Sequence, residues 1–205
     1  MRIILCVLLG YLLGSLSPAA MFSKIKKKNL RKQGTGNLGA TNTMLVLGKR
    51  YGALVMLFDI AKAFVSVKLA QLIFPSFAVC GVLAGGAAVV GHIYPFYMKF
   101  KGGKGLAAFG GFILGVDPLL FLILLIIALV MMLIFNYGVA MPVSAAVLFP
   151  ILYGIRNGDV ASVIVVTMVS ILIICKHLSN IGKAWRKEET KVRDYLKKMF
   201  HKNHE

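Results

Sequence analysis

Residues 91–105 read GHIYPFYMKFKGGKG, and apolar sequence borders them on both sides, VCGVLAGGAAVV before and LAAFGGFILGV after. The whole chain of 205 residues is 59% hydrophobic, with a mean hydropathy of +0.82. A soluble domain of this length would need to present more polar surface. The sequence therefore predicts an all-α, polytopic membrane protein in which this short polar stretch interrupts the apolar helices.

Seven apolar segments approach the ~20 residues that a helix needs to cross a hydrocarbon core of about 30 Å. The segment at 106–116 is the shortest, because 11 residues of helix cover only about 16 Å. We therefore expect this helix to begin within the preceding glycines. The predicted spans are residues 3–23, 51–73, 77–90, 106–116, 119–135, 139–155 and 160–175.

The basic residues are distributed unevenly between the apolar segments. Of the 24 Lys and Arg residues, 20 lie in four tracts, at 24–32, 49–50, 99–104 and 176–202. Seven spans with an external N-terminus and a cytoplasmic C-terminus place all four tracts on one side, as the positive-inside rule expects. The formal net charge of +17 thus indicates anionic lipids or anionic substrates as partners. No nucleic-acid partner is expected, because no DNA- or RNA-binding module is visible.

The cysteines and the two ends of the chain add three expectations. Cys6, Cys80 and Cys175 are scattered through apolar runs, so we expect neither a disulfide framework nor a metal site. The N-terminal run has a weak basic start and no small-residue cleavage site, so we expect an uncleaved span. We expect a membrane domain at 1–180 and a basic cytoplasmic tail at 181–205. The apolar spacing of this tail favours an interfacial helix over a solvated charged segment.

Three polar islands could carry chemistry, and the first is GTGNLGATN at 34–42. It contains G-x-G-x-x-G, but a basic tract rather than a strand precedes it, so a dinucleotide fingerprint is rejected. Its glycines would let backbone N–H groups approach an anion, while Thr35 and Asn37 add polar side chains. The alternative interpretation is a helix cap and turn.

The second island is KGGKG at 101–105, and the third is KHLSN at 176–180. Glycine backbone, Lys104 and the free N–H groups of the following helix together predict phosphate binding, with a flexible basic loop as the alternative. His177 and Asn180 are three residues apart and so share a helix face, although a histidine alone at such a place is usually interfacial. All three islands fall on one predicted side, which indicates a single anion-binding site built from several span ends.

Asp59 and Lys62 lie inside the predicted span at 51–73, again three residues apart. Charges within a membrane are costly unless they pair or face a polar interior. We therefore interpret these two residues as a structural ion pair near the site rather than as catalytic groups.

Together the islands resemble the three motifs of the bacterial acyl-phosphate:glycerol-3-phosphate acyltransferases, the PlsY family. That family has G-S-G-N-x-G-A-T-N, G-H-x-x-P-x-F-x-x-F-K-G-G-K-G, and R-H-x-x-N-I with a glutamate nine residues after the asparagine. The corresponding residues here are GTGNLGATN, GHIYPFYMKFKGGKG, and KHLSNI with Glu189. A D-x-x-K pair also matches at Asp59 and Lys62, and the likeness covers almost the whole chain in order and at matching spacing.

This resemblance implies a monomeric, seven-span enzyme of the bacterial inner membrane whose active site lies at the cytoplasmic face. The implied reaction moves a fatty acyl group from acyl phosphate to the sn-1 hydroxyl of glycerol 3-phosphate. Its products are lysophosphatidic acid and phosphate, for phospholipid biosynthesis, with membrane lipids as surroundings and no cofactor or metal. The implied residues fall into three roles: catalytic His177, Asn180 and Lys104; substrate phosphate-binding Thr35, Gly36, Asn37, Lys101, Gly102, Gly103 and Lys104; and structural support from Asp59, Lys62, His92 and Glu189.

The implied chemistry suits these residue types. An acyl phosphate is already activated, so catalysis needs positioning and charge neutralisation more than a strong nucleophile. Either His177 or a substrate phosphate could take the hydroxyl proton. The H-x-x-x-x-D mechanism of other glycerolipid acyltransferases is excluded, because no histidine here has an aspartate five residues later.

Three departures from the family pattern leave the acceptor and the rate open. Thr35 stands where the family has serine, Leu45 where an arginine is expected, and Ala140 where a serine is usual. Two alternative functions remain, because seven spans around a cationic site would permit transport and the absence of an arginine at Leu45 would permit a scaffold. A transporter or channel for a phosphorylated solute predicts flux without an acyl product, and a lipid-binding scaffold predicts lipid binding that survives Lys104→Ala.

Overall fold

The computed structural model describes residues 1–157 and 159–194. Within these residues the chain is helical and contains no β-strand, which confirms the all-α prediction. The helices are α1 (Arg2–Ser15), α2 (Pro18–Ile25), α3 (Ala40–Leu47), α4 (Lys49–Ile73), α5 (Cys80–Ile93), the 3-10 helix η1 (Phe96–Met98), α6 (Leu106–Val116), α7 (Pro118–Phe135), α8 (Ala140–Asn157) and α9 (Val160–Trp185).

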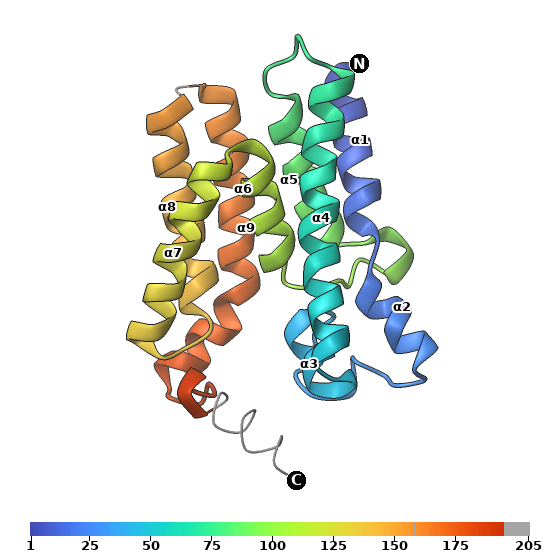
Figure 1. Cartoon of the computed structure of the whole chain (residues 1–205), viewed down its shortest axis with the longest axis vertical. Coiled ribbons are helices and arrows are strands. Elements are labelled where there is room, and N and C mark those ends of the chain that lie inside the picture. The colour runs from blue at the N-terminus through green and yellow to red at the C-terminus, as the bar shows by residue number, and fades with distance from the viewer. Residues whose placement is uncertain (158, 195–205) are drawn as a thin grey trace.

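The long helices form one bundle in two groups (Figure 1). α1, α4 and α5 pack together on one side, α7, α8 and α9 pack in sequence on the other, and α6 lies between them against α4, α5 and α7. The N-terminus and the C-terminal end of α9 lie at opposite ends of the bundle. The loops that carry the first two polar islands lie toward the end where α9 finishes, and the third island lies within the last turns of α9 itself.

Four helical stretches are long and apolar enough to cross a membrane, among the residues that the structure describes. They are Arg2–Ile25, Cys80–Met98, Pro118–Phe135 and Val160–Trp185, and α6 is apolar but shorter. The predicted polytopic class agrees with this finding. α4 is not among these four stretches, and the charged Asp59 and Lys62 interrupt its apolar sequence. The part of the predicted interfacial tail beyond Asp194 lies outside the described residues.

The predicted span at 3–23 lies within the candidate membrane span Arg2–Ile25, but it is not one continuous helix, because the structure breaks it between α1 and α2. Pro18 has no N–H to continue α1, but it fits the first turn of a new helix. Ser17 caps that helix, since its side-chain oxygen accepts a hydrogen bond from the Ala20 N–H at 3.3 Å. The break leaves the carbonyl of Leu16 free to bind a side chain from another helix.

The expectation that the short span begins within the glycines is also wrong. α6 begins at Leu106, and Gly105 precedes it with φ of 93°. This left-handed conformation cannot continue a right-handed helix, and glycine adopts it without a Cβ penalty. The glycines therefore form a loop that enters the bundle and ends at the first residue of α6.

α1 and α5 approach closely because both present small residues at their contact. Residues 10–14 read GYLLG, and a Cβ added at Gly10 or Gly14 would overlap the backbone of Ala84 or Ala88. Spacing small residues four apart on a helix face lets membrane helices pack backbone to backbone. This contact fixes the C-terminal end of α5, from which the loop at 94–105 emerges.

An aromatic cluster holds α6 against α8. The rings of Phe109 and Phe112 lie 5.5 and 5.6 Å from that of Phe149, edge to face, and the Tyr153 ring meets Phe149 edge to face at 5.7 Å. Such pairs contribute about 0.5–1.5 kcal/mol each beyond their burial. The start of α6, next to Lys104, is thereby attached to the second helix group.

Candidate active site

Two tyrosines fasten the loop at 94–105 to α1. The Tyr11 hydroxyl donates to the Tyr94 carbonyl at 2.8 Å, and the Tyr97 hydroxyl donates to the Ser15 carbonyl at 2.7 Å. Lys176 of α9 places its ammonium group 4.1 Å from the centre of the Tyr94 ring. The loop is therefore held from both helix groups before it reaches its glycines.

The glycines of the second island fold back onto the end of α5. The Gly102 N–H donates to the Ile93 carbonyl at 2.9 Å, and the Gly103 N–H donates to the His92 carbonyl at 3.2 Å. A Cβ at Gly103 would overlap the His92 ring, so only glycine permits this approach. These two N–H groups are occupied in this conformation and are not free to act as the phosphate donors that the sequence predicted.

The N-terminus of α6 offers other donors. The N–H groups of Leu106 and Ala107 have no hydrogen-bond partner within residues 1–157 and 159–194. The N-terminal end of a helix carries a partial positive charge and unpaired N–H groups, and it therefore attracts anions. Lys104 stands two residues before this end, so the two positive features lie side by side.

A chain of hydrogen bonds joins the second island to the third. The Lys104 ammonium donates to the Asn180 side-chain oxygen, and the Asn180 amide donates to Glu189 Oε1 at 2.8 Å. Partial burial lowers the pKa of Lys104 below its usual value; Glu189 opposes this effect, and the nearby Lys183 adds to it. The Asn180 side chain thus bridges the Lys104 ammonium and the Glu189 carboxylate. Glu189 orients the amide whose oxygen accepts the hydrogen bond from Lys104.

His177 lies one helical turn before Asn180 and is buried. Its Nδ1 is 2.8 Å from the Ile173 carbonyl, an acceptor, so Nδ1 carries the proton. The other nitrogen, Nε2, then has a free lone pair and can accept a proton.

The first island is a loop pinned by a buried asparagine. Asn42 of α3 accepts a hydrogen bond from the Thr35 N–H at 2.7 Å and donates to the Leu30 carbonyl at 2.8 Å. The Thr35 hydroxyl accepts from the Asn37 N–H at 3.4 Å. Gly36 has φ of 73°, which completes the turn. The turn of the alternative interpretation is therefore present, whereas the helix cap is not, because the N-cap Gly39 of α3 makes no side-chain capping hydrogen bond.

The first island, and Arg31 just before it, contact the second island, but not through Thr35, Gly36 or Asn37. The Leu38 carbonyl lies against Gly103, and the Arg31 guanidinium donates to the Lys101 carbonyl. No hydrogen bond among the described residues joins Thr35, Gly36 or Asn37 to Lys104, Asn180 or His177. The first island therefore borders the site, whereas the second and third meet directly.

The predicted ion pair of Asp59 and Lys62 is present, at 2.7 Å, and it belongs to a larger buried cluster. Lys62 Nζ also donates to the Leu16 carbonyl at 2.7 Å and lies 2.9 Å from His92 Nδ1. Asp59 Oδ1 is 3.3 Å from the same ring nitrogen. The cluster connects α4 to the break after α1 and to His92, whose ring packs on Gly103. It therefore stabilises the position of the loop at 94–105.

Two contacts here escaped sequence reasoning. Arg31 sits in a tract that the positive-inside rule already explains, and Tyr11 sits in an apolar run, so neither carries a local signal.

Among the described residues, no group of three or more His, Cys, Asp or Glu side chains could hold a metal ion.

The chain was compared with known proteins. A family model described as "Glycerol-3-phosphate acyltransferase" matches residues 4–187. A glycerol-3-phosphate acyltransferase of Staphylococcus aureus (strain JH9) is 37% identical over 201 residues, which cover 94% of this chain and 99% of that protein. The protein of strain Newman matches equally.

Two solved structures of PlsY (YgiH), an integral membrane glycerol 3-phosphate acyltransferase, also match. The glycerol 3-phosphate form superposes with a TM-score of 0.86 at 31% identity, covering 93% of this chain and 96% of that one. The lysophosphatidic acid form gives 0.84 at 30% identity, covering 93% and 95%. Both superpositions cover most of the chain, and the residues 4–187 that the family model matches contain all three islands.

Proposed function

The chain belongs to the glycerol-3-phosphate acyltransferase family, an integral membrane family of phospholipid synthesis, and we propose that it acylates the sn-1 hydroxyl of glycerol 3-phosphate with acyl phosphate as donor. The observation that carries this proposal is the contact between Lys104 and Asn180. It joins two motifs beside the N-terminus of α6, where a phosphate would be stabilised. The solved PlsY forms with glycerol 3-phosphate and lysophosphatidic acid support the same acceptor and product.

The proposed reaction needs no covalent enzyme intermediate. The hydroxyl oxygen of glycerol 3-phosphate attacks the acyl carbon, the bond from that carbon to the phosphate oxygen breaks, and phosphate leaves. Lys104 and the N–H groups of Leu106 and Ala107 neutralise the charge that grows on the departing phosphate. Donors fixed in this way before the reaction stabilise developing charge more than mobile water does.

The hydroxyl proton has two acceptors in this scheme. One is His177 Nε2, which the Ile173 carbonyl holds in the basic form. The other is a substrate phosphate, whose second pKa is near 6, as for a phosphorylated side chain. If His177 is the acceptor, His177→Ala lowers kcat by about 10²–10⁴-fold. Unchanged turnover in this variant, with a rate that follows phosphate ionisation, would assign the proton to the substrate.

We further propose seven spans, formed by the α1–α2 pair, α4, α5, α6, α7, α8 and α9, with an external N-terminus and a cytoplasmic C-terminus. The site then lies at the cytoplasmic face of the inner membrane, on a monomer. Charge supports this orientation, because Arg156 at the opposite end pairs with Asp117 at 2.8 Å. The orientation is tested by cysteine labelling of the variants Lys32→Cys and Asn157→Cys. Labelling of Asn157→Cys from outside the cell, and of Lys32→Cys only from the cytoplasmic side, supports the orientation.

The function is tested with purified full-length protein in bilayers. Palmitoyl phosphate and glycerol 3-phosphate are supplied, and phosphate and lysophosphatidic acid are both followed. Equal amounts of the two products, with the acyl group at sn-1, support the proposal. An acyl thioester in place of acyl phosphate should give no product. Solute flux without acyl product would favour a transporter, and lipid binding without either would favour a scaffold.

A further inference from the structure

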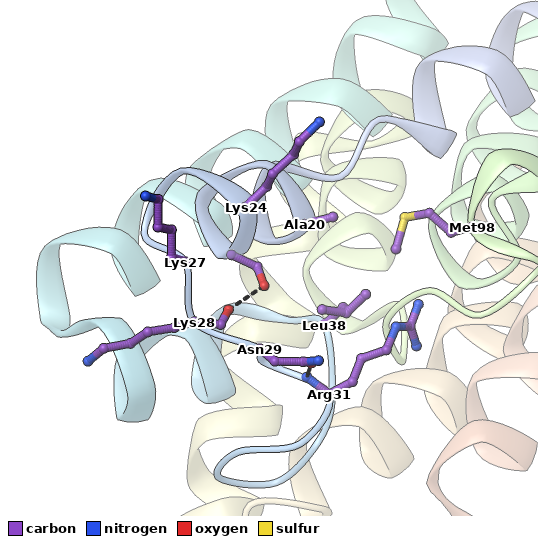
Figure 2. A pocket seen from close by; sticks show the side chains of 9 residues that line it. Ala20, Lys24, Lys27, Lys28, Asn29, Arg31, Leu38 and Met98 are labelled. Atoms are coloured by element: carbon purple, nitrogen blue, oxygen red, sulfur yellow. Dashed lines mark hydrogen bonds between the residues drawn. The ribbon is translucent and has the colours of Figure 1, made fainter.

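A cavity of about 410 Å³ lies between α2 and the loop at 94–105, apart from Lys104 and Asn180. This volume is within the range of small-ligand sites, about 300–1,000 Å³. The side chains that form it come from α2, from the loop that follows and from η1, as Figure 2 shows. They are Ala20, Ser23, Lys24, Lys27, Lys28, Asn29, Arg31, Leu38 and Met98.

The charge of this cavity is positive and uncompensated. Lys24, Lys27 and Arg31 make no ion pair within residues 1–157 and 159–194. No acidic residue precedes Asp59 in the sequence. Lys28 contributes its aliphatic stem, because its ammonium group donates to the Val46 carbonyl at 3.2 Å. Three cationic residues line one cavity without a carboxylate among the lining residues, which favours an anionic occupant.

The wall of the cavity is held in shape by its own hydrogen bonds. The Ser23 hydroxyl donates to the Lys28 carbonyl at 2.6 Å, and the Arg31 N–H donates to Asn29 Oδ1 at 3.0 Å, both drawn in Figure 2. Leu30 is fully buried behind this segment and packs with Ala19 and Leu38. The basic segment is thus held in one conformation by its own hydrogen bonds and by its packing on the buried side chain of Leu30.

The elements that form the cavity also carry exposed apolar side chains. Leu38 and Met98 line the cavity, and α2 and the loop at 94–105 expose Met21 at 53%, Ile25 at 63%, Phe96 at 51% and Phe100 at 59%. A small dissolved anion would gain nothing from these side chains, whereas lipid chains would cover them. Cationic side chains beside exposed apolar ones are typical of a site at a membrane interface.

We propose that this cavity binds the phosphate headgroup of an anionic membrane phospholipid, whose chains lie over Met21, Ile25, Phe96 and Phe100. The site is separate from the one that holds the substrates. Arg31 connects the two, because its guanidinium also donates to the Lys101 carbonyl. An anion in the cavity would therefore act on the same loop that carries Lys104.

The test uses the full chain in phosphatidylcholine nanodiscs doped with phosphatidylglycerol, and native mass spectrometry counts the lipids that stay bound. Each cation near an anionic lipid strengthens binding by about fivefold. Lys24→Gln/Lys27→Gln should therefore lower the retained phosphatidylglycerol by at least about tenfold. The matched control is Lys26→Gln/Lys32→Gln, which removes two exposed cations of the same tract that do not line the cavity and should retain phosphatidylglycerol.

Two further measurements separate this proposal from others. Lys104→Ala should keep the bound phosphatidylglycerol while losing turnover, whereas Lys24→Gln/Lys27→Gln should turn over substrates in detergent within about twofold of wild type. An equal loss of lipid in both double variants would overturn the proposal, because it would show attraction to the whole basic tract. Binding of inorganic phosphate alone, with no retained lipid, would overturn it in favour of a free anion.

Discussion

The ammonium group of Lys104 donates a hydrogen bond to the side-chain oxygen of Asn180, although 76 positions separate the two residues. Asn180 in turn donates to Glu189. These two hydrogen bonds link the loop after α5 to the end of α9, and they fix the position of the Lys104 ammonium beside the N-terminus of α6. The proposed phosphate contact depends on this geometry, and the predictions below follow from it and from the packing that supports it.

Glu189 holds the Asn180 amide, and its neighbour Glu188 offers a matched comparison. Glu189→Gln removes the charge that orients the amide, so kcat/KM should fall about tenfold or more, since hydrogen bonds to charged groups contribute about 1.5–3 kcal/mol. Glu188 pairs with Arg186 at the surface, so Glu188→Gln should change it by less than about fivefold. The measurement is kcat/KM of both variants by steady-state kinetics. An equal change in kcat/KM would mean that Glu189 does not contribute to the active site.

The charge of Lys104 predicts a basic limb in the pH profile. Burial lowers the pKa of Lys104 below the ordinary lysine value, so the side chain loses its proton, and its attraction for phosphate, at a lower pH than an exposed lysine. As pH rises through this lowered pKa, kcat/KM should fall. Lys104→Arg stays charged throughout, so its slower reaction should lack this limb. The same limb in both proteins would assign the titration to another group.

Gly14 and Gly138 test the close packing of α1 on α5. A Cβ at Gly14 would overlap the backbone of Ala88, whereas a Cβ at Gly138 meets nothing within 4 Å. Gly14→Ala should lower the free energy of unfolding by about 1–3 kcal/mol, seen as a lower melting temperature in detergent. Gly138→Ala is the control and should melt like wild type. If Gly14→Ala melted no lower than this control, α1 and α5 would not be in backbone contact.

The buried cluster around Lys62 predicts a sharp contrast between single and double variants. Asp59→Leu leaves the Lys62 ammonium buried without its carboxylate, which should cost about 3–5 kcal/mol of stability. Asp59→Leu/Lys62→Met removes both charges and should recover most of that loss. Thermal melts of the two proteins form the comparison. A double variant less stable than the single one would mean that the charges are not coupled.

Local sequence patterns predicted much of the helical frame. α6 covers the predicted apolar segment 106–116, although it was expected to begin earlier, and α9 contains the whole predicted span 160–175, because apolar length and flanking polar residues are local properties. Pro18 breaks the first span, and its effect could also have been read locally. α3 was not predicted, because eight residues beside glycines carry too little periodicity.

The site was predicted as three segments rather than as contacts. Lys104, His177 and Asn180 were each identified, but nothing in the sequence indicates that Arg31 meets Lys101 or that His92 lies against Lys62. Such contacts depend on how distant helices pack, which has no local signature. The glycines show the limit most clearly: their type permitted free N–H groups, whereas the fold uses those of Gly102 and Gly103 to close the loop on α5.

The central claim is that Lys104 binds a substrate phosphate, and the most direct measurement compares Lys104→Ala with Lys99→Asn in the bilayer assay. Lys99 is an exposed cation of the same loop with φ of 55°, a conformation that asparagine tolerates. Lys104→Ala should lower kcat/KM for phosphate release and lysophosphatidic acid together by about 10²–10³-fold. Lys99→Asn should stay within about fivefold of wild type. Wild-type kcat/KM in folded Lys104→Ala would contradict the account.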